Sequence, residues 1–339
     1  MIRIAVDAMG GDYAPREVVY GAVLAASEYG VAIQLVGPPD VVSNELKRHS
    51  ISGLDITVVP ASEVVAMDEK PSRAIVKKKD SSIVVATRQV SEGLADALVA
   101  AGSTGAAAVA AQIGLGRIAH VDRSAIACVM PTTSPERPVI VLDVGANVDC
   151  SAHQLLQFGL MGTILSKGLF NRSDPAVGLL NIGTEETKGN SLVQEAYKLF
   201  KENQQLNFHG FIEGRDFPMA KIDVVVTDGF TGNVMLKTAE GIAKMISLML
   251  RQELLRNTRS KVGSLIAKPA FEALKRRIDY NESGGALLIG VKGVCVIAHG
   301  GSKHTAVKNA IHVAKDMVAA NMVKQIEWTL SLVEAGSKS

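Results

Sequence analysis

Short apolar runs that end at glycine-bearing turns recur along the chain. They are rich in Val, Ile, Leu and Ala and lack polar alternation, which is typical of strands buried on both faces of a sheet. Such strands, each followed by a glycine turn, are predicted at 2–7, 33–36, 97–101, 139–143, 177–181, 222–228 and 294–299. Two further strands are predicted at 56–59 and 125–130.

Stretches with helical spacing of apolar residues separate these runs. One follows Asp12, where Pro15 suits a first helical turn, and the others lie at 106–113, 154–167, 192–201, 233–256 and 305–320. Strands that alternate with helices predict a mostly parallel sheet covered on both faces. We therefore expect residues 1–339 to form one large α/β unit, a three-layer α/β/α sandwich.

The segment 251–277 differs from the rest of the chain. It holds eight basic and two acidic residues, whereas the whole chain has a formal net charge of only +2. Apolar residues are interleaved with these charges, so the segment is amphipathic, and Pro269 is expected to break it into two helical arms. We therefore predict a protruding helical hairpin within 240–280.

Composition excludes several classes of protein. With 339 residues, 47% of them hydrophobic, the chain is long enough to bury a large core, which excludes disorder and a disulfide-stapled mini-protein. Its three cysteines have no C-x-x-C spacing, so we expect neither disulfides nor a zinc site. The net charge is too small for a nucleic-acid partner. We find no signal peptide and no apolar run that spans a bilayer.

Polar residues and glycines gather in the turns that follow the predicted strands. In open parallel sheets, ligands bind beyond the carboxyl ends of the strands, and glycine turns that lead into helices present N–H groups to an anion. One such turn is ordinary in any α/β protein, but several turns with polar side chains predict a phosphate pocket. The candidate phosphate- or substrate-binding residues are Asp7, Gly10, Gly11, Gly102, Ser103, Thr104, Gly105, Asp143, Asn147, Gly183, Thr184, Asp228, Gly229, Thr231, Gly232 and His299.

Three side chains in these turns have alternative interpretations. Lys188 either places a mobile positive charge over the pocket or is a solvated surface lysine. The Asn233 amide either caps a helix or donates to a developing oxyanion. His299 binds substrate or hydrogen-bonds a neighbouring loop. The run 77–79, with Arg73 one turn earlier, is a solvated helix face or a contact for an acidic partner.

Standard nucleotide and hydrolase motifs are missing from the sequence. The segment 183–189 has its second glycine after the lysine, unlike a P-loop. The G-x-G-x-x-A match at 114–119 follows a helical stretch and is interpreted as a helix end. No G-x-S-x-G or H-E-x-x-H motif indicates a serine hydrolase or a zincin.

An ordered set of motifs nevertheless resembles a known family from end to end. The motifs are Asp7–Asp12, Ala101–Ala106, Asp143–Asn147, Leu179–Thr184 with Lys188-Gly189, Asp223–Val234 and Ala298–Gly300. The sequence resembles the PlsX family, the acyl-carrier-protein:phosphate acyltransferases of phospholipid synthesis. Two departures are visible: Ser103 stands where the family often has Asn, and the loop 299–304 is more basic than the usual His-Gly-Ser-Ser.

The resemblance implies a fold like that of isocitrate dehydrogenases and phosphotransacetylases, and a homodimer. It implies that inorganic phosphate attacks the thioester of a long acyl chain on acyl carrier protein, with Lys188 and Asn233 as the catalytic residues. No cofactor and no metal are expected. It also implies work at the cytoplasmic face of the membrane, where acyl phosphate passes to a membrane-embedded glycerol-3-phosphate acyltransferase.

Alternatives of other classes stay open. They are a short-chain phosphate acyltransferase or an NAD-dependent dehydrogenase on the same fold, and a non-catalytic scaffold that binds acyl carrier protein. The hairpin docks the acidic carrier, dips into an anionic membrane, or supports a dimer, and membrane contact is favoured because acyl phosphate must reach a membrane enzyme. The candidate contact residues are Arg251, Leu254, Arg256, Arg259, Lys261, Leu265, Ile266, Lys268 and Phe271.

Overall fold

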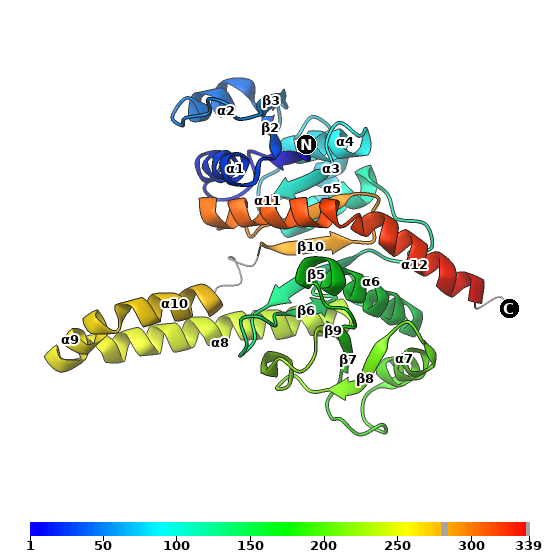
Figure 1. The fold of residues 1–339 in the computed structure, drawn as a ribbon. Coiled ribbons are helices and arrows are strands. Elements are labelled where there is room, and N and C mark those ends of the chain that lie inside the picture. Colours follow the sequence, from blue (N-terminus) through cyan, green and yellow to red (C-terminus); the bar gives the residue numbers. More distant parts are fainter. Residues whose placement is uncertain (279–283, 337–339) are drawn as a thin grey trace.

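The described part of the chain forms one sheet of eleven strands, in the order β3-β2-β1-β4-β11-β10-β5-β6-β9-β7-β8. The computed structural model describes residues 1–278 and 284–336 (Figure 1). The strands are β1 (Arg3–Asp7), β2 (Ala32–Gly37), β3 (Ile56–Pro60), β4 (Ala97–Ala100), β5 (Ala125–Met130), β6 (Val139–Leu142), β7 (Ala176–Leu180), β8 (Asn207–Ile212), β9 (Val224–Val226), β10 (Ala286–Ile289) and β11 (Val294–Ile297).

The strands form two parallel sets that run in opposite directions. β3, β2, β1, β4 and β11 are mutually parallel, and so are β6, β9, β7 and β8. Between the sets lie three antiparallel pairs: β11 with β10, β10 with β5, and β5 with β6. Because three is an odd number of reversals, the strands of the second set run opposite to those of the first. The carboxyl ends of the two sets therefore lie at opposite edges. The expectation that all glycine turns share one edge is wrong.

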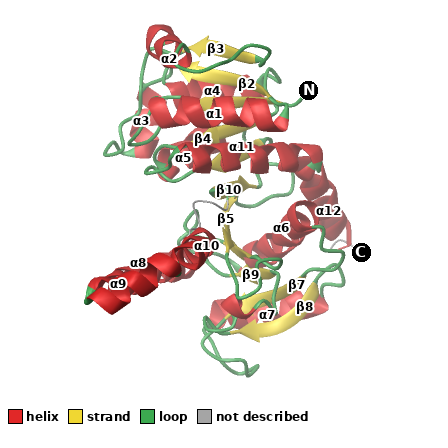
Figure 2. Ribbon diagram, turned by 60° about the vertical axis from the view of Figure 1, so that its left-hand side comes forward, coloured by secondary structure: helices red, strands yellow, loops and turns green. Residues whose placement is uncertain are grey.

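Both faces of the sheet are buried, which confirms the predicted three layers (Figure 2). Successive residues of one strand enter different cores: Ile4 and Val6 of β1 belong to one cluster and Ala5 to the other. The first core is covered by α1 (Arg16–Tyr29), α2 (Pro39–Leu46), α6 (Ala152–Phe170), α7 (Ser191–Glu202), α11 (His304–Ala319) and α12 (Met322–Gly336). The second is covered by α3 (Pro71–Lys77), α4 (Ser82–Ser91) and α5 (Thr104–Gly114).

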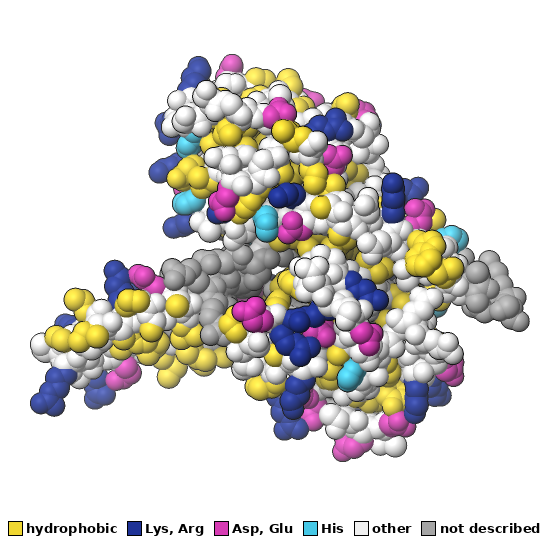
Figure 3. Space-filling model, viewed as in Figure 1, with side chains coloured by type: hydrophobic (Ala, Val, Ile, Leu, Met, Phe, Trp, Pro, Cys, Tyr) yellow, Lys and Arg dark blue, Asp and Glu magenta, His cyan; other side chains and the backbone are white. Residues whose placement is uncertain are grey.

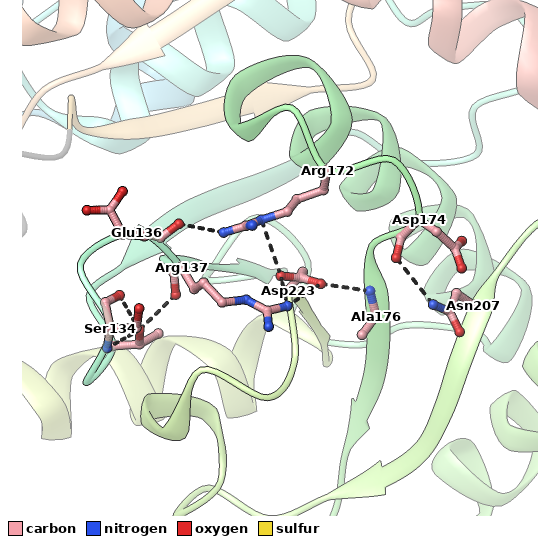
Figure 4. Close-up of polar contacts among 9 residues, drawn as sticks. Ser134, Glu136, Arg137, Arg172, Asp174, Ala176, Asn207 and Asp223 are labelled. Carbon is pink, nitrogen blue, oxygen red and sulfur yellow. Dashed lines mark hydrogen bonds and ion pairs between the residues drawn. The ribbon is translucent and has the colours of Figure 1, made fainter.

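A buried carboxylate holds the start of the second strand set together (Figure 4). Asp223, just before β9, accepts the Ala176 N–H at 2.9 Å and Nη2 of Arg137 at 3.1 Å. Nε of Arg172 lies 3.6 Å from the same carboxylate, and its Nη2 donates to the Glu136 carbonyl at 2.5 Å. The β5–β6 connection is thereby fastened to β7 and β9, at the edge opposite Asp228.

The predicted hairpin is present and projects from the sheet (Figure 1). It consists of α8 (Gly229–Leu255), which leads outward, and α9 (Thr258–Ile266) with α10 (Lys268–Ile278), which return. Pro269 lies in the first turn of α10, directly after the break at Ala267. The side chains of 275–277 are outside the described residues. Among the described helices, none is long and apolar enough to cross a membrane.

Candidate active site

The turns after β1, β4 and β11 pack tightly against each other at the first edge. A β-carbon on Gly10 would lie 2.9 Å from the Gly102 nitrogen, and one on Gly11 would lie 2.6 Å from the Ala101 carbonyl oxygen. Gly11 also has a φ of +102°, a conformation that favours glycine. The Asp12 N–H donates to the Gly300 carbonyl at 2.9 Å. Glycine is therefore required because backbone meets backbone in these turns.

Polar side chains at this edge are partly engaged within the turns. Asp7 is 4% exposed, and burial raises the pKa of its carboxyl against the lowering effect of hydrogen bonds from Ser82, Met9 and Gly10. Ser103 caps α5 by accepting the Ala106 N–H at 3.4 Å. The exposed His299 accepts the Gly301 N–H of its own turn at 3.1 Å, and its contact with a neighbouring loop or with substrate stays a prediction. Thr104 and Gly105 are exposed in the first turn of α5.

At the second edge, Asp143 organises the loop after β6. Its carboxylate is fully buried and accepts five N–H donors, from the backbones of Ile126, Gly145, Ala146 and Asn147 and from the Asn147 side chain. Asn147 donates a second amide hydrogen to the Ser124 carbonyl at 2.8 Å. These contacts hold the loop in place and leave both carboxylate oxygens engaged, so the structure gives Asp143 and Asn147 a positioning role. Their contact with substrate stays a prediction.

The first turn of α8 lies directly on this loop. Asp228 caps the helix: its Oδ1 accepts the Thr231 N–H at 2.8 Å, and its Oδ2 accepts the Thr231 hydroxyl at 2.8 Å. The Gly229 N–H donates to the Asn147 carbonyl at 2.8 Å. A β-carbon on Gly232 would overlap the Asp143 carbonyl oxygen. Helix and loop are therefore in backbone contact, and only glycine fits at this position.

Asn233 follows that contact and is exposed at the site. Because Asp228 caps α8, the alternative that Asn233 is the cap is wrong. A β-carbon on Gly145 would lie 3.6 Å from Cγ of Asn233, so the amide stands over the loop that Asp143 holds. A neutral amide in the second turn of a helix, beside the positive end of its dipole, is suited to donate to an anion.

Lys188 lies in the loop after β7, the strand that pairs with β9. Its backbone is held on both sides: Asn181 Nδ2 donates to the Lys188 carbonyl at 3.1 Å, and Gln194 Nε2 donates to the same oxygen. The side chain is exposed and makes no ion pair with the part of the chain that the structure describes. Asn181 and Gln194 are positioning residues that sequence reasoning missed, although Asn181 ends a predicted strand.

Gly183, which is buried, packs against the Lys188 side chain, whereas Thr184 is exposed on the same loop. The Glu186 carboxylate is directed away from Lys188, because it binds Tyr197 and Lys201. These two contacts lower the pKa of the Glu186 carboxyl. The structure thus places the predicted residues in two groups. One follows β1, β4 and β11, and the other follows β6, β9 and β7 and includes Lys188 and Asn233. Within the described ranges, no cluster of His, Cys, Asp and Glu has metal-binding geometry.

Solved structures share this fold. A phosphotransacetylase from Streptococcus pyogenes aligns with a TM-score of 0.65 over 94% of both chains at 17% identity. A 4-hydroxythreonine-4-phosphate dehydrogenase from Klebsiella pneumoniae aligns with a TM-score of 0.51 over 94% of this chain and 99% of that chain, at 12% identity. At these identities the likeness shows the fold alone, and it confirms the predicted phosphotransacetylase-like architecture.

Curated relatives are much closer in sequence. The phosphate acyltransferase of Heliobacterium modesticaldum is 49% identical over 96% of this chain and 97% of its own length. That of Trichodesmium erythraeum is 45% identical over 96% and 95%. The family model described as fatty acid synthesis protein matches residues 2–325. This chain therefore belongs to the phosphate acyltransferase family, the fatty acid synthesis proteins that the sequence motifs indicated.

Proposed function

We propose that this enzyme transfers a long-chain acyl group from acyl carrier protein to inorganic phosphate. A phosphate oxygen attacks the thioester carbonyl, the C–O bond forms, and the C–S bond breaks. The proton that phosphate carries ends on the departing sulfur, so the products are acyl phosphate and free carrier thiol. Phosphate is already an anionic nucleophile, and a thiol of pKa about 8.5 leaves readily, so the reaction needs no covalent enzyme intermediate.

One observation carries the proposal: an exposed lysine and an exposed amide stand on adjacent turns of one sheet edge, over a loop held by a buried carboxylate. Lys188 supplies a positive charge for phosphate, and Asn233 supplies a hydrogen-bond donor for the oxyanion of the tetrahedral intermediate. Asp143 and Asp228 stabilise this geometry before substrate binds. Positioning and charge neutralisation are the contributions that this reaction requires.

The first group of turns, with Asp7, Gly102 and His299, is assigned to the carrier-bound thioester. Neighbouring strands of a twisted sheet are rotated by about 20–25° relative to each other. This twist accumulates over the strands between β4 and β6, so the carboxyl ends of the two strand sets do not point in directly opposite directions. This arrangement supports a reaction between groups bound by both sets of turns.

The direct test is incubation of the purified chain with palmitoyl acyl carrier protein and inorganic phosphate, with free carrier thiol and acyl phosphate both quantified. We expect the two products in equal amounts, and only when phosphate is present. Carrier binding without thioester cleavage would instead support the scaffold alternative. Activity confined to acetyl or butyryl thioesters would support a short-chain enzyme, and stabilisation by NAD would support a dehydrogenase.

The hairpin supports a second proposal, contact with a membrane surface. On α9, Leu265 and Ile266 are each 78% exposed and lie next to the exposed Arg259 and Lys261. An amphipathic helix of this kind inserts apolar side chains at the interface while basic residues bind anionic headgroups. Leu254 and Phe271 differ, because they line an apolar groove of about 1250 Å³ between α8, α10 and the short turn Phe217–Met219.

Replacing both exposed α9 residues, Leu265→Glu with Ile266→Glu, is expected to abolish flotation of the protein with vesicles that contain anionic lipid. Two buried charges outweigh the apolar area that the pair contributes at the interface. Leu332→Glu, an exposed leucine of α12, is the control and should float like the unmodified chain. Flotation of the double variant at the unmodified level would exclude α9 as the contact.

The remaining apolar side chains of α8 fit the proposed homodimer. Met245, Leu248 and Met249 are about half exposed along one side of the helix and do not line the groove. Apolar side chains gather along the projecting hairpin (Figure 3). An exposed apolar stripe on a projecting helix marks an interaction surface, and we assign its cover to a second copy of the chain. With the hairpin at the membrane, acyl phosphate would be released where a membrane-embedded glycerol-3-phosphate acyltransferase can take it.

A further inference from the structure

The segment 61–81, between β3 and α4, forms a closed loop that contains α3. Its ends are joined, because the Glu63 N–H donates to the Asp80 carbonyl at 3.1 Å and the Ser82 N–H donates to the Glu63 carbonyl at 3.0 Å. Inside the loop, Lys78 Nζ donates to Glu69 at 2.6 Å and to the Val64 carbonyl at 2.7 Å. These hydrogen bonds fix the position of α3 relative to the sheet.

The basic residues of this loop separate into two kinds. Lys78 is used internally, whereas Lys70, Arg73 and Lys77, and Lys79 beyond the helix, are exposed. Arg73 and Lys77, four residues apart, lie on one face of α3, and Lys70 directly precedes the helix as its N-cap. None of the three forms an ion pair with another described residue. The interpretation of 77–79 as one solvated helix face is therefore wrong for Lys78, whose side chain holds the loop together.

This basic face adjoins the first group of turns. A β-carbon on Gly105 would lie 3.0 Å from Cγ of Pro71, and one on Gly300 would lie 2.6 Å from Cε of Met67. Exposed Arg16 and Lys303 stand at the starts of α1 and α11, on the same sheet edge. The exposed acids of these loops, Asp12, Asp68 and Asp80, are fewer than the exposed basic residues. The entrance to these turns is therefore bordered by positive charge.

We propose that the α3 face, defined as Arg73 and Lys77 of the helix with Lys70 at its N-cap, docks the acidic surface of acyl carrier protein. The proposal rests on the proposed function, in which the carrier delivers its thioester to the first group of turns. Charge complementarity selects this partner, and the short path from α3 to Gly105 and Gly300 allows the carrier to dock while its arm enters the site. The basic hairpin is less suited, because α8 has 27 residues and would separate its tip from the sheet by about 40 Å.

The test compares a protein-bound with a protein-free thioester. Arg73→Glu with Lys77→Glu should raise the KM for palmitoyl acyl carrier protein at least about tenfold, with kcat within about twofold, because paired charges across an interface govern encounter and affinity. The salt dependence of kcat/KM should weaken in this variant. Palmitoyl pantetheine, which lacks the acidic protein, should be used equally well by the variant and the unmodified enzyme.

Two matched double variants serve as controls. Lys198→Glu with Lys324→Glu changes the net charge equally on α7 and α12 and should leave the KM unchanged. Arg256→Glu with Arg259→Glu places the same change on the hairpin, and a rise in KM there, with none for α3, would overturn the proposal. Equal losses with palmitoyl pantetheine would overturn it as well, since they would indicate a damaged site.

A binding measurement separates this proposal from the proposed function. Fluorescence anisotropy with labelled carrier protein that bears no acyl chain reports docking without chemistry. Weaker binding by the α3 variant supports the docking surface even if the unmodified chain forms no acyl phosphate. Unchanged binding and an unchanged KM in a chain that forms acyl phosphate would refute the docking surface and leave the proposed function intact.

Discussion

Asn233→Ala is expected to lower the rate of acyl phosphate formation about 100- to 1000-fold, the loss typical when one oxyanion donor is removed. The amide is exposed over the loop 143–147 and makes no contact that α8 needs, because Asp228 supplies the cap. The melting temperature should therefore stay within about one degree of the unmodified value, since surface substitutions usually change stability by less than about 0.5 kcal/mol. A discontinuous assay of acyl phosphate checks the rate, and a thermal melt checks the stability.

Lys188→Ala should likewise remove most of the acyl phosphate formation. Here the KM for phosphate should rise as well, because the lysine supplies charge in the ground state and in the transition state. Lys188→Arg should recover part of the rate, since the charge remains but its geometry changes.

Val234→Ala is the control for Asn233, because it changes the next residue on another face of α8. Lys221→Ala is the control for Lys188, as an exposed lysine outside the site. Near-normal turnover by a folded Asn233→Ala or Lys188→Ala enzyme would place the chemistry elsewhere.

Gly232→Ala is expected to abolish activity and to destabilise the protein. The added methyl group would overlap the Asp143 carbonyl, and neither α8 nor the loop below it can yield without moving the site. Overpacking of this kind costs about 1–3 kcal/mol, and a displacement of about 1 Å at a catalytic group can cost about 100-fold in rate. Urea denaturation and the acyl phosphate assay measure the two effects.

Gly241→Ala provides the matched control on the same helix. No atom lies within 4 Å of a β-carbon at that position, so the change should stabilise α8 by about 0.5–1 kcal/mol through helix propensity alone. If Gly232→Ala behaved like Gly241→Ala, with activity retained, the close contact between α8 and the Asp143 loop would be irrelevant to function.

The missed reversal of the sheet had a local signal in the sequence. Eight residues separate Met130 from Val139, too few for a crossover between parallel strands, which needs a dozen or more. The strand β10 was not among the predicted strands, although only four residues, 290–293, separate it from β11, and so short a link again requires an antiparallel pair. Apolar periodicity reports burial and not direction. Nine strands of the described residues were therefore predicted, whereas β8 and β10 were missed and the prediction of a single edge failed.

Other elements escaped for related reasons. β8 lies at one end of the sheet and has several half-exposed residues, so it lacks the continuous apolar run of the central strands. The helix α2 has only eight residues, and its short length gives little periodic pattern. Lys78 was indistinguishable from its neighbours because its partners, Glu69 and Val64, meet it only after the loop closes.

The sequence by itself determined the strand and helix types, the burial of both sheet faces, the glycine turns and the family, because these depend on local patterns and residue identity. Only the tertiary structure decided that the turns divide between two sheet edges, and that Asp143 and Asp228 hold the site while Lys188 and Asn233 remain exposed. It also decided which lysines of the α3 loop face outward. These properties depend on strand direction and on partners distant in the sequence, which are established only when the strands pair.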